Sequence, residues 1–184
     1  MFDKDLNFTG KHAFYFKDLC ELRANVPDRD KHAKFKILNS YIDAYILCPL
    51  IGYQYNRKAT ADNSIPDDVG ILLDAITRRK KELKFVYQVL MLADEESEPD
   101  PDKRIYRATN FSENTDEEKE FMKNNMKIYD SYFYGGIEVL HEQFVDQCIT
   151  DDDYLKQMYK FVKDFEEEQN GEALSESINR YLNK

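Results

Sequence analysis

Apolar residues recur every three or four positions along most of this chain, which is the spacing of amphipathic helices rather than of strands. The spacing predicts helices over about 11–25, 34–51 and 67–93. A short helix is expected to begin at Pro101, because proline is favoured in the first turn. No segment predicts a strand, and we find no internal repeat. We therefore expect an all-α fold, a single-domain bundle of six to eight helices over residues 1–184.

The second of these segments is apolar around its whole circumference towards Ile51, which is typical of the most buried helix of a bundle. Pro49 has no amide hydrogen for a bond to residue 45, so we expect it to kink or end the helix. The apolar stretch contains Asp43 and is too short to span a bilayer. It predicts a buried helix, and we expect no contact with a membrane.

The second half of the chain has clearer helix boundaries. Thr115 and Glu118 have the spacing of a capping box, and a helical rhythm follows them as far as Gly135-Gly136 and again over 137–149. Glycine inside a helix costs up to about 1 kcal/mol per residue. The glycine pair therefore predicts either a hinge or a place where another backbone comes close.

Turn-forming residues divide the rest of this half. Acidic residues and prolines follow one another in a stretch without apolar side chains, which predicts a flexible acidic linker at about 94–102. Thr150 is expected to cap an amphipathic helix, and Asn170-Gly171 should end that helix before a short final one.

Charge changes this picture because it is divided unevenly along the chain. Residues 1–92 have a net charge of +3 and residues 93–184 one of −13, which together give the −10 of the whole sequence. Unlike charges steer association and like charges repel, so this division favours two surfaces with two different partners. The overall acidity argues against general nucleic-acid binding. Mimicry of DNA by the acidic residues would require one organised negative face.

The cysteines indicate a reducing environment. Cys20, Cys48 and Cys148 lie far apart in apolar stretches and have no disulfide-framework spacing. We expect them to behave as small buried apolar residues. The beginning of the sequence has no signal-peptide pattern, so a cytoplasmic protein is the simplest expectation.

The motif with the most chemical character is Glu138-x-x-His141, whose side chains point from one helix face as in carboxylate-bridged di-iron bundles. Such a site needs a second pair, and neither His12 nor His32 has a glutamate at that spacing. We expect His141 to bond instead to Glu138 or to a carbonyl group. Motifs for nucleophilic catalysis, phosphate loops and dinucleotide binding do not occur. No catalytic, cofactor or metal residue is therefore predicted, and an enzyme would require a site formed only in the fold.

A basic cluster on the predicted helix 67–93 is the clearest candidate for a contact surface. Other basic residues would join it if the helices pack suitably. The candidates for contact with a partner or with nucleic acid are Arg57, Lys58, Arg78, Arg79, Lys80, Lys81, Lys84, Arg104 and Arg107. Contact with phosphates would release counterions and depend strongly on salt. The alternative is a solvated helix face whose aliphatic stems cover the core.

Three stretches carry a resemblance to known proteins. They are residues 41–53 continuing to Ala59, Gly10-Lys11-His12-Ala13, and residues 135–140. In these stretches the chain resembles small accessory proteins of bacterial anti-phage defence loci. The resemblance implies a small helical, non-catalytic subunit that works with a larger ATPase or nuclease, as in three-component SMC-like complexes or Dnd-type systems.

The sequence thus predicts a helical adaptor without a cofactor, which binds a larger protein subunit and reaches nucleic acid only through the complex. Two other functions stay open. One is a DNA-binding protein that uses the basic cluster. The other is a metal-dependent or hydrolytic enzyme around Glu138 and His141.

Overall fold

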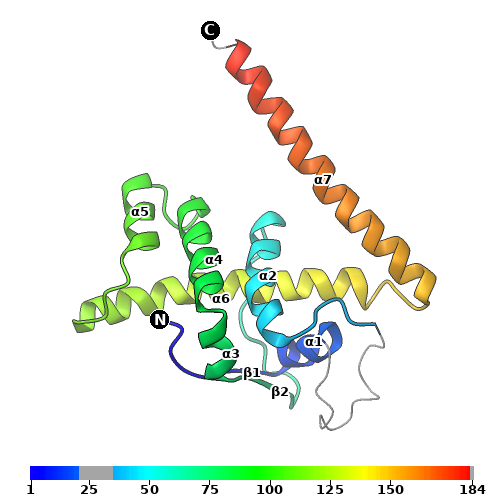
Figure 1. The fold of residues 1–184 in the computed structure, drawn as a ribbon, viewed down its shortest axis with the longest axis horizontal. Helices are drawn as coiled ribbons and strands as arrows, with labels where there is room; N and C mark the ends of the chain where they lie inside the picture. Colours follow the sequence, from blue (N-terminus) through cyan, green and yellow to red (C-terminus); the bar gives the residue numbers. More distant parts are fainter. Residues whose placement is uncertain (21–34, 183–184) are drawn as a thin grey trace.

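The computed structural model describes residues 1–20 and 35–182, and within the last helix it describes side chains only to Glu167 and at Gly171. The described residues form seven helices and one two-stranded sheet, so the chain is mostly helical but not all-α. Figure 1 shows the long helix α6 (Asp116–Phe144) crossing the molecule, with α1 (Lys11–Leu19) and α2 (Tyr41–Gln54) packed against it.

The sheet pairs two strands that are far apart in the sequence. β1 (Leu6–Thr9) and β2 (Asp68–Ile71) are antiparallel, with Phe8 opposite Val69. Val69 and Ile71 are buried while Asp68 and Gly70 are exposed, which is the alternation of a strand with one covered face. The prediction of a helix from residue 67 is therefore wrong for this strand. The rest of that segment is helical, in two pieces: α3 (Leu73–Arg78) and α4 (Lys80–Ala93).

Helix α2 begins later than predicted and passes through its proline. The Ser40 side chain caps the helix by accepting a hydrogen bond from the Asp43 amide, while Leu38 forms a parallel bridge with Cys20. Pro49 cannot donate to the Tyr45 carbonyl, but the Tyr129 hydroxyl of α6 donates to that oxygen at 2.8 Å. The helix therefore continues to Gln54.

The first predicted helix is confirmed from Lys11 to Leu19, after which Cys20 is extended. Its predicted continuation to residue 25 and the break at Pro27 lie outside the described residues.

The glycine pair lies inside one continuous helix, because α6 runs unbroken through it. A Cβ atom at Gly136 would overlap the Cys48 carbonyl group, and one at Gly52 would overlap the Tyr132 carbonyl group. These glycines let the backbones of α2 and α6 meet, so the second of the two predicted roles is the observed one. The predicted capping box of Thr115 and Glu118 begins this helix and is confirmed.

The acidic stretch 94–102 leads into α5 (Pro101–Thr109), which begins at the predicted proline. Its first residue, Asp94, is buried and accepts hydrogen bonds from the Tyr132 hydroxyl at 2.9 Å and the Ser97 amide at 3.2 Å. This end of the stretch is thus fixed to α6. The flexibility of the remainder stays a prediction.

Helix α7 (Asp151–Leu182) is longer than predicted, because it continues through Asn170-Gly171. Thr150 accepts a hydrogen bond from the Asp153 amide, which confirms the predicted cap. Figure 1 shows α7 projecting away from the other helices. Within the described residues no helix is long and apolar enough to cross a membrane.

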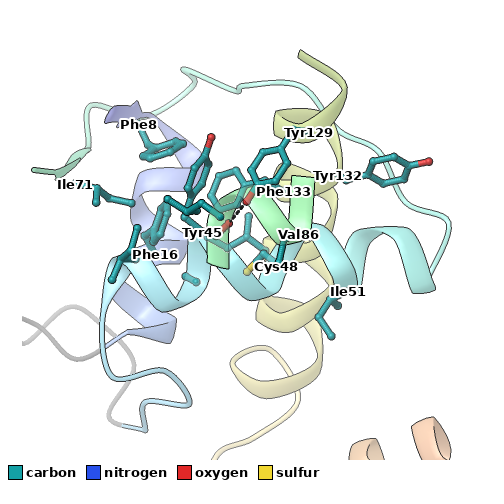
Figure 2. Packing of buried hydrophobic residues seen from close by; sticks show 14 of the residues in the cluster. Phe8, Phe16, Tyr45, Cys48, Ile51, Ile71, Val86, Tyr129, Tyr132 and Phe133 are labelled. Carbon is teal, nitrogen blue, oxygen red and sulfur yellow. Dashed lines mark hydrogen bonds between the residues drawn. The ribbon is translucent and has the colours of Figure 1, made fainter. Parts of the chain in front are cut away.

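Aromatic residues supply the largest fully buried side chains of the core, several of them at the crossing of α1, α2 and α6. The Tyr45, Tyr129 and Phe133 rings meet edge to face, with centroids 5.2 Å apart between Tyr45 and each of the others. Figure 2 shows this cluster with Phe8 of β1 and Phe16 of α1 beside it. The sheet therefore closes one end of the same core that the helices form.

Candidate functional site

The basic cluster of residues 78–84 lies at the end of α3 and the start of α4, and its members contact different groups. Arg78 pairs with Asp74, and Arg79 lies between Asp43 at 2.8 Å and Glu82. Arg79 thereby ties α4 to α2. The Lys84 ammonium lies 4.6 Å from the centroid of the Phe111 ring. Among the described residues, Lys80 and Lys81 have neither an acidic partner nor an aromatic ring in contact.

Arg57 and Lys58 follow α2 and bind acidic residues of two other segments. Arg57 donates two hydrogen bonds to Glu142, at 2.6 and 2.7 Å, and a third to Glu138 at 2.9 Å. These contacts hold the pKa of the Arg57 guanidinium above its usual value. Lys58 donates to Glu96 at 2.8 Å. Both side chains fasten the end of α2 to its surroundings.

The two arginines of α5 are also engaged. Arg104 donates to Glu95 at 3.0 Å and to two backbone carbonyls of the acidic stretch. Arg107 is buried, 3.5 Å from Asp94. Of the nine predicted contact residues, seven thus bind groups of their own chain. Arg78, although paired with Asp74, is 72% exposed, and Lys80 and Lys81 beside it have no acidic partner among the described residues.

The glutamate of the Glu-x-x-His motif binds residues from two other segments. Glu138 accepts a hydrogen bond from Arg57, lies 3.3 Å from the Lys11 ammonium, and lies 3.2 Å from Nε2 of His12. The Asp62 amide donates to Nδ1 of His12, which assigns the ring proton to Nε2 and makes it the donor to Glu138. Burial opposes the charge of Glu138, but Lys11, Arg57 and His12 together hold its pKa below the usual value.

The histidine of the motif has a different partner from the one expected. Nε2 of His141 lies 2.9 Å from the buried carboxylate of Asp18, and the Tyr15 ring stacks on the imidazole at 3.7 Å. The expectation that His141 bonds to Glu138 or to a carbonyl is therefore wrong. The reason is that α1 lies along α6 and presents an acid of its own, which no local spacing in the sequence reveals.

These contacts form a polar cluster that joins α1, α6 and the segment after α2, and each of its members has a partner. The cluster consists of Lys11, His12, Asp18, Arg57, Glu138, His141 and Glu142. His12 is fully buried, and burial lowers the pKa of its imidazole, so it stays neutral. Within the described residues no group of three or more His, Cys, Asp or Glu side chains could hold a metal ion. Burial raises the pKa of the thiols of Cys20 and Cys48, which disfavours the reactive thiolate. The cluster is suited to fastening helices together.

An exposed apolar surface lies on α7. Tyr154 stacks on Phe35, and Phe161 lies edge-on to Phe144, so one face of the helix is anchored to the body. A neighbouring face carries a row of apolar side chains at the spacing of one helical stripe. This α7 stripe consists of Leu155, Tyr159 and Val162, which are 63, 71 and 60% exposed.

A row of lysines runs beside the α7 stripe. Lys156, Lys160 and Lys163 each follow a stripe residue by one position, so they form an adjacent row on the helix. All three are exposed. The outer two make long surface pairs with Asp152 and Glu167, at 3.8 and 3.3 Å. Such pairs contribute little to stability, so the lysines are available to another molecule.

A second exposed apolar stripe lies on α4. Phe85, Val89 and Leu92 follow the same spacing and are 65, 36 and 45% exposed. Lys81 lies one turn before Phe85 on the same stripe. In contrast to the α7 stripe, this α4 stripe belongs to a helix that packs against both α2 and α5.

Comparison with family models, with curated proteins and with solved structures finds no match to this chain. The α7 stripe was within reach of sequence reasoning, because its residues carry a helical rhythm. What the rhythm does not reveal is that this face lies on a helix that projects from the body.

Proposed function

We propose that this protein is a non-catalytic adaptor that binds a protein partner through α7. The observation that carries the proposal is the α7 stripe, an apolar face on a helix that projects from the rest of the fold. Burying a large apolar side chain is favourable by about 1.5–3 kcal/mol. Leu155, Tyr159 and Val162 would together supply much of the free energy that a docking contact needs.

The neighbouring lysine row indicates the chemistry of the partner. A protein surface with an apolar strip flanked by carboxylates would cover the α7 stripe and meet Lys156, Lys160 and Lys163. Association costs several kcal/mol in lost translational and rotational entropy, so burial of the α7 stripe alone is insufficient for stable binding. The flanking charges raise the association rate and the specificity. Nucleic acid would use the lysines but leave the apolar stripe exposed to water, which makes protein the better fit.

The resemblance at residues 41–59 gives the class of partner to test first, a large ATPase or nuclease of a bacterial anti-phage complex. Two other functions have less support. Direct DNA binding through the basic cluster is weakened by the partly buried ion pairs of Arg57, Arg79 and Arg104. An enzyme around Glu138 and His141 is weakened because both side chains bind groups of their own chain.

A pull-down from the native host, with nuclease treatment, tests the proposal with two matched variants. Tyr159→Ser and Phe85→Ser each remove one aromatic ring, 71 and 65% exposed, from the α7 and α4 stripes respectively. We expect Tyr159→Ser to lose a stoichiometric partner that the wild type and Phe85→Ser retain. Loss with Phe85→Ser alone would place the docking face on α4. Equal retention by both variants, or a partner released by nuclease, would contradict the proposal.

A further inference from the structure

A groove beside the first half of α6 contains a carboxylate that has no cationic partner within ion-pair distance among the described residues. The groove lies between the residues that precede β1 and the first half of α6, and its volume is about 540 Å³. This is within the range of sites that bind small organic molecules. It shares no residue with α7, so what it binds is independent of the docking function proposed above.

Asp130 of α6 is the distinctive residue of this groove. One of its carboxylate oxygens accepts a hydrogen bond from the hydroxyl of Tyr45, at 2.8 Å. Among the described residues no lysine, arginine or histidine lies within ion-pair distance of Asp130. Lys4 acts on it only at longer range. Burial raises the pKa of Asp130 to about 6, as expected for a carboxylate with one neutral donor and no counterion.

Most of the other charged groups at the groove have partners, but Lys4 and Lys127, which also line it, form no ion pair with the described residues. Lys119 pairs with Asp116 at 2.9 Å and Lys123 with Glu120 at 3.3 Å, on the outer surface of α6. Glu113, a second acid of the lining, pairs with the amino group of Met1 at 2.7 Å. Asp130 is thus the acid of the groove whose charge is least compensated.

The walls of the groove are largely apolar. Phe2 and Met122 are buried, and Leu6 and Met126 lie beside them. An aliphatic chain would cover these side chains, while a cationic end would reach the carboxylate. We propose that the groove binds a primary ammonium group on a short aliphatic chain, with Asp130 as its counterion.

A set of three ligands of equal length tests the charge that the groove selects. Isothermal titration at pH 8 measures the affinity of the full chain for n-hexylamine, n-hexanol and n-hexanoate. A charge-assisted hydrogen bond to Asp130 is worth about 1.5–3 kcal/mol, so we expect hexylamine to bind about 10- to 100-fold more tightly than hexanol. Tighter binding of hexanoate than of hexylamine would show that the lysines at the groove select an anion, which would contradict the proposal. Equal binding of all three ligands would show that the groove binds only the aliphatic chain, which would also contradict it.

Two variants connect this preference to the residue. Asp130→Asn keeps an acceptor for Tyr45 and should reduce hexylamine affinity by about tenfold or more, with hexanol affinity unchanged. Asp164→Asn removes an exposed carboxylate of α7 and should change neither. In the wild type, NMR chemical-shift changes at the backbone amides of Phe2, Leu6 and Met126 on addition of hexylamine locate the ligand without any substitution. If these amides show no saturable chemical-shift change with hexylamine up to about 10 mM, any binding is weaker than this very weak limit, and the proposal is overturned.

Discussion

The close crossing of α2 and α6 predicts that a single methyl group will destabilise the protein. Gly136→Ala places a Cβ atom on the Cys48 carbonyl group, which belongs to helix backbone and cannot move aside as a flexible side chain would. The substitution gains up to about 1 kcal/mol from helix propensity. Overpacking of a well-filled site costs about 1–3 kcal/mol, and the upper end applies here because the two helices must separate along their contact. We therefore expect a net loss of about 2 kcal/mol in the free energy of unfolding.

Thermal and urea unfolding, followed by circular dichroism, measure this loss. A loss of 2 kcal/mol corresponds to a fall in Tm of about 4–8 °C for a protein of this size. Gly171→Ala is the matched control, because it adds the same methyl group to a helix where nothing lies within 4 Å. It should leave stability unchanged or raise it slightly. If Gly136→Ala is as stable as Gly171→Ala, the backbones of α2 and α6 do not meet as described.

Three further predictions concern buried polar groups. Tyr129→Phe leaves the Tyr45 carbonyl without a donor and should lower the free energy of unfolding by about 1–3 kcal/mol in urea titrations; an unchanged midpoint would contradict this. Burial opposes the charge of Asp94, yet hydrogen bonds hold the pKa of this carboxyl below its usual value. The ionised carboxylate therefore stabilises the fold above about pH 4, and this stabilisation is lost as the pH falls further. In a plot of unfolding free energy against pH, Asp94→Asn should reduce the decrease below about pH 4. The pKa of Asp130 is raised to about 6, about two units above the usual carboxyl value, so Asp130→Asn should be favoured over the wild type by at most about 3 kcal/mol at pH 7; this advantage should fall between about pH 6 and pH 4, and one that persists below about pH 3 would refute the assignment.

Local signals in the sequence were sufficient for elements that are stabilised locally. The capping box of Thr115 and Glu118 and the proline that begins α5 are examples, because the groups that end or begin a helix lie within one turn. The strand β2 was missed because Val69 has the helical spacing to Leu72, Leu73 and Ile76, and because the partner strand β1 is far away in the sequence. Long-range pairing decided between the two structures.

The candidate sites likewise depend on contacts between residues that are far apart in the sequence. Where α2 passes Pro49, the Tyr45 carbonyl accepts a hydrogen bond from the Tyr129 hydroxyl, which only the crossing with α6 supplies. Arg57 and Arg79 looked like surface charges, but acids from other helices bind them in the fold. The stripe on α7 was visible as periodicity, while its exposure depends on where the helix points.

Hydrogen–deuterium exchange of the co-purified complex tests the docking function most directly. Exchange at the amides of 155–163 is compared with exchange at those of 81–92, in the free protein and in the complex. The account predicts that partner binding slows exchange in 155–163 and leaves 81–92 unchanged, because the α7 stripe becomes covered. Slowed exchange confined to 81–92, with α7 unaffected, would contradict the central claim.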